Sequence, residues 1–245
     1  MSTAVARPVF LYLLLPPLQD FSCLKLDEED EWLSVQRLAE TLCYCTNLQT
    51  LYLRGMGMTD AFMQQLASRL KDSRLGDAPS SSLARLKFLD LTGNHLGAAG
   101  LHALCEALGS GIGPSLETIA LQCNLMGDGG AQALAAGLQS SCMPRSLKTI
   151  DLAVNDVGDV GAAALADALL HSRSTCQLVL YWNRFGVAAQ SKLMRAFQAR
   201  DGATSLVQLF YIAGMNPPCF PASLSLRIAE GHRAVMEELL FTYFD

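Results

Sequence analysis

The same pattern of residues is written three times in succession in the middle of the chain. The three copies align without a gap and read LKFLDLTGNHLGAAGLHALCEAL (86–108), LETIALQCNLMGDGGAQALAAGL (116–138) and LKTIDLAVNDVGDVGAAALADAL (147–169). A fourth copy at 175–197 keeps the frame with weaker similarity. One asparagine marks the same place in every copy, so the spacing from copy to copy is nearly constant. Self-similarity at a nearly fixed period is typical of a solenoid, in which stacked units share one core.

Each copy carries the signals of a strand, a turn and a helix. Leu89 and Leu91 have the period of two that a strand with one buried face requires. An asparagine follows, and its amide can satisfy both donors and acceptors of a buried turn. These asparagines are Asn94, Asn124, Asn155 and Asn183. Apolar residues ten and fourteen positions later have the i, i+4 spacing of one helix face, and glycines at the turn predict freedom for the backbone to change direction.

A strand, a turn and a helix in about 28 residues resemble the leucine-rich repeat. The long helical half, with a glycine six residues after the asparagine, resembles its ribonuclease-inhibitor-like subclass. The resemblance implies an α/β leucine-rich repeat solenoid, a right-handed horseshoe with parallel strands on the concave face and helices on the convex face. We expect about six to seven repeats between terminal caps.

The repeat domain is expected to span residues 21–214, with a degenerate first repeat and a last strand within 205–214. Residues 1–20 are interpreted as an N-terminal cap, since a solenoid must cover its open ends. Their apolar run, 9–15, also suggests a processed targeting segment, but Pro16 and Pro17 end it far short of a membrane span. Residues 215–245 are interpreted as a capping segment with a helix, and docking onto a partner is the alternative.

The second repeat departs from the pattern in two ways. Met56 occupies the asparagine position, so its turn needs another hydrogen-bond partner. The step from Met56 to Asn94 is longer than the steps between the asparagines, because the polar segment 71–82 is inserted between the helix and the next strand. Such a segment predicts a surface loop, which a solenoid tolerates at low cost.

Composition excludes some function classes. A net charge of −5 and a pI near 5.4, with no Lys/Arg run, argue against a nucleic-acid surface. The eight cysteines are scattered through the repeats, which predicts free thiols in a reducing, cytoplasmic compartment. The acidic run 27–31 could suggest a metal site, although carboxylates at the start of a helix are favoured by its dipole.

We find no pattern of residues that predicts catalysis. The four histidines lie in different repeats or in the tail, and no pair has the spacing of metal ligands or of a nucleophile with its base. The glycine-rich pieces GAAG and GDGG lack the Lys-Ser/Thr of a phosphate loop. The sequence therefore predicts a protein that is not an enzyme, with no cofactor, metal, small-molecule substrate, nucleic acid or membrane as its ligand.

The resemblance places the strand residues that alternate with the buried leucines on the concave face. The middle of that face is small and polar, and aromatic groups gather toward its ends. The predicted protein-binding residues are Val179, Tyr181, Trp182, Phe210 and Ile212 in one group and Tyr52, Arg54 and Phe88 in a second. The chain's own C-terminal tail covering the first group is an equally good interpretation.

These features favour a non-enzymatic scaffold that binds protein partners, as a subunit or adaptor of a larger complex. The low share of charged residues, 17%, favours a place in an assembly, and fold-level analogy suggests a cytoskeletal or ciliary one. The alternative is a regulator of an enzyme, either an inhibitor or a GTPase activator that presents Arg54 or Arg184. A third hypothesis, the sensing end of an innate-immune receptor, lacks an accompanying nucleotide-binding domain.

Overall fold

A computed structural model describes residues 22–26, 35–45, 47–72, 83–140, 143–172 and 177–201. The chain divides into two compact units, Met1–Gly214 and Met215–Asp245, and every described residue belongs to the first. The predicted caps, 1–20 and 215–245, and the last predicted strand lie outside the described residues. They stay predictions.

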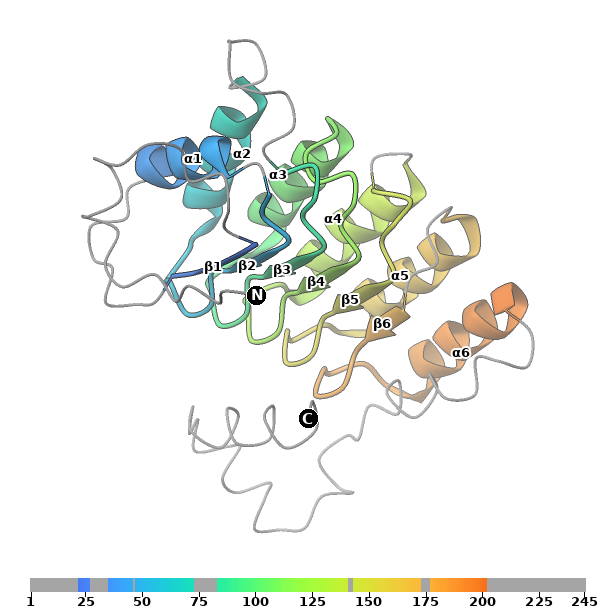
Figure 1. The fold of residues 1–245 in the computed structure, drawn as a ribbon. Coiled ribbons are helices and arrows are strands. Elements are labelled where there is room, and N and C mark those ends of the chain that lie inside the picture. Colours follow the sequence, from blue (N-terminus) through green and yellow to red (C-terminus); the bar gives the residue numbers. More distant parts are fainter. Residues whose placement is uncertain are drawn as a thin grey trace. The chain divides into compact units, whose positions relative to one another are not determined.

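Strands and helices alternate through the described part of the chain (Figure 1). The strands are β1 (Cys23–Lys25), β2 (Thr50–Tyr52), β3 (Phe88–Asp90), β4 (Thr118–Ala120), β5 (Thr149–Asp151) and β6 (Gln177–Val179). The helices are α1 (Val35–Tyr44), α2 (Asp60–Asp72), α3 (Ala98–Gly109), α4 (Gly127–Gln139), α5 (Asp159–His171) and α6 (Val187–Asp201). All six strands are parallel and stand in chain order in one sheet, and Figure 1 shows the helices on one side of it. The predicted α/β solenoid is confirmed.

The strands pair in register, so each repeat places its apolar centre beside that of the next. Leu51 pairs with Leu89, which pairs with Ile119, and the row continues through Ile150 to Leu178. All five side chains are buried in a single apolar cluster with the inner faces of the helices. The predicted helix face is confirmed, because its eight members are all in that cluster: Leu104, Leu108, Leu134, Leu138, Leu165, Leu169, Leu193 and Phe197.

Each asparagine side chain joins two repeats, as the sequence predicts for a buried turn. The Asn124 amide donates to Leu121 O in its own repeat at 3.0 Å and to Leu91 O in the preceding repeat at 3.0 Å. Its Oδ1 accepts the N–H of Leu96, also in the preceding repeat, at 3.0 Å. Asn94, Asn155 and Asn183 make the same kind of bonds, and all four side chains are buried. Every amide therefore completes the turn of the repeat before it.

The turn at Met56 obtains its partner from the next repeat. Asn94 Oδ1 accepts the N–H of Met58 at 2.9 Å, and its Nδ2 donates to Leu53 O at 2.8 Å. The Gly55 N–H also donates to Thr92 O at 2.9 Å. An apolar residue is tolerated at Met56 because the asparagine that serves this turn comes from the following repeat.

The residue before the asparagine position adopts a left-handed conformation in five described repeats. Glycine occupies it twice, at Gly55 (φ 67°) and Gly93 (φ 70°), but Cys123, Val154 and Trp182 have φ of 54°, 57° and 57°. Side chains rarely adopt this region, at a cost of about 1 kcal/mol or more. The stacked asparagine turns therefore impose a backbone that three of these residues disfavour.

The second glycine column has a different role from the predicted one. A Cβ at Gly100 would lie 2.5 Å from Asp60 Oδ1, and one at Gly161 would lie 2.7 Å from Asp128 Oδ1. Neither glycine has a positive φ, so the expectation of backbone freedom is wrong for them. They are small because an aspartate of the preceding repeat reaches across to the start of their helix.

These aspartates cap the helix of the following repeat. Asp128 Oδ1 accepts the N–H groups of Gly158 at 2.7 Å and Gly161 at 2.8 Å, at the start of α5. Asp60 serves Gly97 before α3 in the same way, at 2.6 Å. Carboxylates there stabilise both the unpaired N–H groups and the helix dipole. The bonds fix the spacing of neighbouring helices.

An apolar cavity of about 50 Å³ lies between the second and third repeats, which the inserted segment 71–82 separates in the chain. Side chains of α2 and α3, including Leu66, Ala67, Leu104 and Ala107, line it together with leucines of the two strand segments. The side chains between α2 and α3 thus leave room for one or two additional methyl groups.

We predict that Asn155→Ala lowers the free energy of unfolding by about 3 kcal/mol or more. The change removes three buried hydrogen bonds of the amide. It leaves the Asn124 N–H without a partner, whereas Leu121 O keeps its bond from the Asn124 side chain and Ala153 O keeps its bond from the Cys123 N–H. Chemical denaturation of both proteins measures the effect. Gln132→Ala, at an exposed position of α4, is the control and should change stability by less than about 0.5 kcal/mol. Similar losses in both variants would contradict the role of the amide.

We predict that Ala107→Val raises the free energy of unfolding by up to about 1 kcal/mol, because two buried methyl groups outweigh the helix propensity of valine. Ala168 is the matched control, since it occupies the same place after Asn155 that Ala107 occupies after Asn94. It is fully buried and does not line the cavity, so Ala168→Val should destabilise by about 1–3 kcal/mol through overpacking. Thermal or denaturant melts that shift in the same direction for both would contradict the packing difference.

Candidate functional site

The sheet has a second face, opposite the helices, that we call the strand face. Side chains of a strand alternate between two sides, so the residues between the buried leucines point away from the helices. The row through the last residue of each strand contains Lys25, Tyr52, Asp90, Ala120, Asp151 and Val179 in register. The predicted site residues with described positions fall on this face or at its edge.

A hydrogen-bonded network of buried side chains occupies the centre of the strand face. The Thr92 hydroxyl donates to Gln122 Oε1 at 2.6 Å, and Gln122 Nε2 donates to Asp151 Oδ2. Asp151 Oδ1 accepts the N–H of Ala153 at 3.0 Å, and Asp90 Oδ1 accepts the N–H of Thr92 at 2.9 Å. The predicted small, polar middle is present, but its side chains are buried and bond to one another. These side chains therefore have few donors or acceptors left for hydrogen bonds to a partner.

The network shifts the titration of Asp151. Burial raises the pKa of this carboxyl from an ordinary 3.8 to about 6, and the nearby Asp90 carboxylate adds to the rise. The hydrogen bonds from Ala153 and Gln122 act in the opposite direction but do not cancel the burial. Ionised Asp151 at neutral pH is therefore a cost to the folded state.

The structure brings together Tyr52, Arg54 and Phe88, which we call the Arg54 group. The rings of Tyr52 and Phe88 lie 5.5 Å apart, centroid to centroid, with an interplanar angle of 51°. Arg54 Nε lies 3.4 Å from Asp90 Oδ2 and is buried, while the Arg54 side chain as a whole is 41% exposed. The same part of the strand face therefore carries two partly exposed aromatic rings and a cation whose opposing carboxylate is buried.

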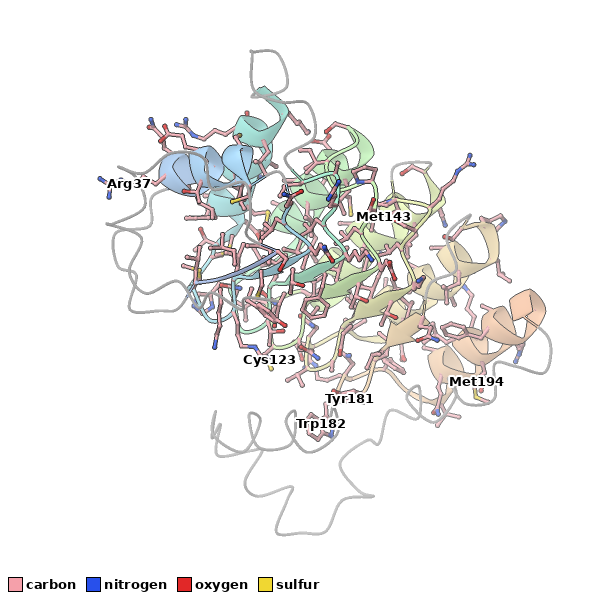
Figure 2. All side chains as sticks on the ribbon, in the orientation of Figure 1. Arg37, Cys123, Met143, Tyr181, Trp182 and Met194 are labelled. Atoms are coloured by element: carbon pink, nitrogen blue, oxygen red, sulfur yellow. The ribbon has the colours of Figure 1, made fainter. Side chains whose placement is uncertain are left out.

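Val179, Tyr181 and Trp182 form a second group at the β6 end of the sheet. The rings of Tyr181 and Trp182 meet edge to face, with centroids 5.3 Å apart. Figure 2 shows both at the edge of the described part, on the side away from Met143. Phe210 and Ile212, the other predicted members, lie outside the described residues. Whether they extend this group stays a prediction.

The other residues singled out for chemistry are the cysteines and the acidic run 27–31, and that run lies outside the described residues. Burial and the Asp151 carboxylate raise the pKa of the Cys123 thiol to about 11, so that the thiol is protonated at neutral pH. The five described cysteines are free thiols, as predicted: Cys23, Cys43, Cys45, Cys105 and Cys123. In the ranges that the structure covers, His, Cys, Asp and Glu form no group of three that could hold a metal ion. The helices described there include none that could span a lipid bilayer.

Sequence reasoning missed the buried network and its raised pKa. A signal was present, because Asp90, Thr92, Gln122 and Asp151 are polar residues at alternating strand positions of adjacent repeats. Their burial depends on side chains of neighbouring strands, which the register supplies and a single repeat does not.

Comparison with known families agrees with this geometry. Three segments match the family model described as Leucine Rich repeat, at residues 85–105, 114–135 and 144–166. The three matched units are leucine-rich repeats. Repeats of this family generally mediate protein–protein interactions and are not generally catalytic. Stacked repeats of this kind form extended binding surfaces. The ribonuclease-inhibitor-like subclass stays a prediction.

A curated relative extends the match beyond the three segments. The leucine-rich repeat chain is 33% identical over 150 residues to the Tonsoku-like protein of Mus musculus. The alignment covers 53% of this chain but 11% of that protein. The chain thus spans a small part of the relative's length.

We predict that Asp151→Asn raises the free energy of unfolding at pH 7 by roughly 1–3 kcal/mol, because the neutral amide avoids the cost of a buried carboxylate. The folded pKa is raised, so the folded state of the unaltered protein gains protons as pH falls through 6. The advantage of the variant should therefore shrink between pH 6 and about 4 and vanish below. The Gln122 amide can flip and keep its bonds to Thr92 and residue 151. Denaturation at several pH values measures the difference, and an effect independent of pH would contradict the raised pKa.

Proposed function

We propose that the strand face of this leucine-rich repeat array binds a protein partner, and that the chain serves as a subunit or adaptor of a larger complex. The observation that carries the proposal is the contrast along this face. Its centre is buried and internally hydrogen-bonded, whereas Tyr52, Arg54 and Phe88 are partly exposed.

The residue types of the Arg54 group support partner binding. Tyrosine and arginine are enriched among residues that dominate binding energies, and aromatic rings bury large areas with few rotatable bonds. Here the two rings already contact each other, so little side-chain freedom is lost when a partner covers them. The group is a preorganised surface in which a cation is bordered by apolar area.

The helix side of the array is a weaker candidate for binding a protein partner. Exposed charges there pair across neighbouring repeats, as Lys71 does with Glu106 and Lys192 with Asp167, at 3.3 Å and 2.7 Å. Exposed ion pairs of this kind contribute little to stability, but each of these four charges already has an opposing charge within the array. The strand face is the better candidate.

The second aromatic group ranks below the first. Tyr181 and Trp182 have other interactions within the protein in addition to their mutual ring contact. A partner would have to compete with those interactions. The Arg54 group is therefore our primary site, and Val179, Tyr181 and Trp182 are the secondary one.

The finer alternatives have unequal support. The proposal that Arg184 acts as an arginine finger is weakened by its bond to Asp156, to whose Oδ2 its Nη2 donates at 2.8 Å. The cytoskeletal or ciliary setting rests on analogy between folds alone. A protein scaffold is the form of the proposal that the strand face supports, and its cytoplasmic location stays a prediction.

We predict that Tyr52→Ala combined with Phe88→Ala reduces recovery of the specific partner at least about tenfold, because truncating two hot-spot rings costs more than about 1 kcal/mol each. Crosslinking of the full-length protein in cell extract, followed by mass spectrometry, identifies the partner and maps its contacts.

The matched control is Leu170→Ala, which removes an apolar side chain that is 47% exposed on α5. It should leave recovery unchanged, and melting curves should show that all variants fold. Equal recovery with the double variant, or crosslinks confined to the helix side, would contradict the proposal.

A further inference from the structure

The exposed part of the Arg54 group presents hydrogen-bond donors without matching acceptors. Arg54 carries five donors and no acceptor, and its pairing with Asp90 involves only Nε. Within the described residues, neither Nη group of Arg54 nor the Tyr52 hydroxyl makes a hydrogen bond. An occupant that satisfies this surface must supply acceptors.

The charges around the group have one sign at the surface. Among the described residues of β2 and β3 and the positions that continue them on the strand face, Arg54 is the partly exposed charged side chain. Asp90 is the acidic residue of these segments, and its side chain is 3% exposed beneath Arg54. This part of the strand face is thus complementary to an anion, although the chain as a whole has a net charge of −5.

The geometry also fixes how an anion could approach. Arg54 Nε is buried against Asp90, so the side-on edge of the guanidinium is closed to a ligand. The terminal Nη groups remain, and two parallel N–H groups match the two oxygens of a carboxylate. A single accessible arginine suits a singly charged carboxylate better than a phosphate, which usually gathers several cations.

We propose that Arg54 binds a carboxylate of the protein partner end-on through its two Nη groups, while the neighbouring apolar residue of the partner packs on Tyr52 and Phe88. The Tyr52 hydroxyl is a further donor to the same carboxylate. This inference rests on the proposed function and specifies its ligand: an Asp or Glu side chain next to an apolar residue.

Asp90 acts as the internal competitor of that ligand. It holds Arg54 by a single contact of 3.4 Å, which is too long for a good charge-assisted hydrogen bond. The arginine is thus compensated in the absence of a partner but keeps most of its donors. Removing the Asp90 charge should strengthen carboxylate binding instead of weakening it.

The experiment uses two dipeptide probes and the full-length protein. The probes are N-acetyl-Leu-Glu-amide and its neutral match N-acetyl-Leu-Gln-amide, titrated to millimolar concentrations. NMR detects the Nε–H resonance of Arg54, which Arg54→Gln identifies by its loss, together with backbone resonances of β2 and β3. The glutamate probe should bind at least about fivefold more tightly than the glutamine probe, since a charge-assisted pair replaces a neutral one.

The variants give effects of opposite sign. Asp90→Asn keeps an acceptor for the Thr92 N–H and should tighten binding of the glutamate probe about two- to fivefold. Arg54→Lys should weaken it, because an ammonium group lacks the paired N–H geometry. Combined Arg54→Gln and Asp90→Asn avoids a lone buried carboxylate, so it should fold and bind both probes equally. Arg184→Gln, in an ion pair elsewhere, is the control and should change nothing.

Equal binding of the two probes to the unaltered protein would overturn the inference, as would weaker binding to Asp90→Asn. Neither result touches the loss of partner recovery on removing the two rings. A charge-selective probe response combined with unchanged partner recovery in the ring variant would instead refute the proposed function and leave the carboxylate site in place.

Discussion

The buried asparagine amide is the interaction on which this array depends. Strands and helices of such short length are not stable alone, and the repeats bury one shared core only if every turn stacks on the next. A turn in that position places backbone N–H and carbonyl groups away from water. Asn94, Asn124, Asn155 and Asn183 satisfy those groups in two repeats at once, so the same side chain shapes its own turn and fixes its neighbour.

A second set of contacts connects the repeats in the opposite direction along the chain. Asp60, Asp128 and Asp159 accept N–H groups at the start of the helix that follows, whereas the asparagines bond to the repeat that precedes. Ala98 interrupts the aspartate column before α4, and there the N–H of Gly127 donates to Asn155 O at 2.9 Å. Strand spacing and helix spacing are thus set by different residues, and the glycines at the helix starts leave room for the second set.

Features that the residue pattern of a single repeat determines could be predicted from the sequence. Features that depend on side-chain contacts between neighbouring repeats could not. The buried leucines and the asparagine turns follow from periodicity and the chemistry of an amide. The roles of Gly100 and Gly161, the left-handed backbone at Val154 and the burial of Asp151 depend on side chains of the neighbouring repeats. The ring contact of Tyr52 with Phe88 was within reach, because the register pairs Tyr52 with Asp90 and Thr50 with Phe88 and so makes the two rings diagonal neighbours on one face. The contact of Arg54 with Asp90 was not, since it depends on side-chain conformations.

The direction in which the asparagines reach has a consequence for biosynthesis. A ribosome releases the chain from its amino end, so each turn emerges about one repeat ahead of the amide that completes it. Asn94 must leave the exit tunnel before the Met58 turn is satisfied, and Asn124 before the Leu96 turn. Folding of the array should therefore lag behind synthesis by about one repeat. A chain that stalls between repeats would expose one incomplete turn to chaperones.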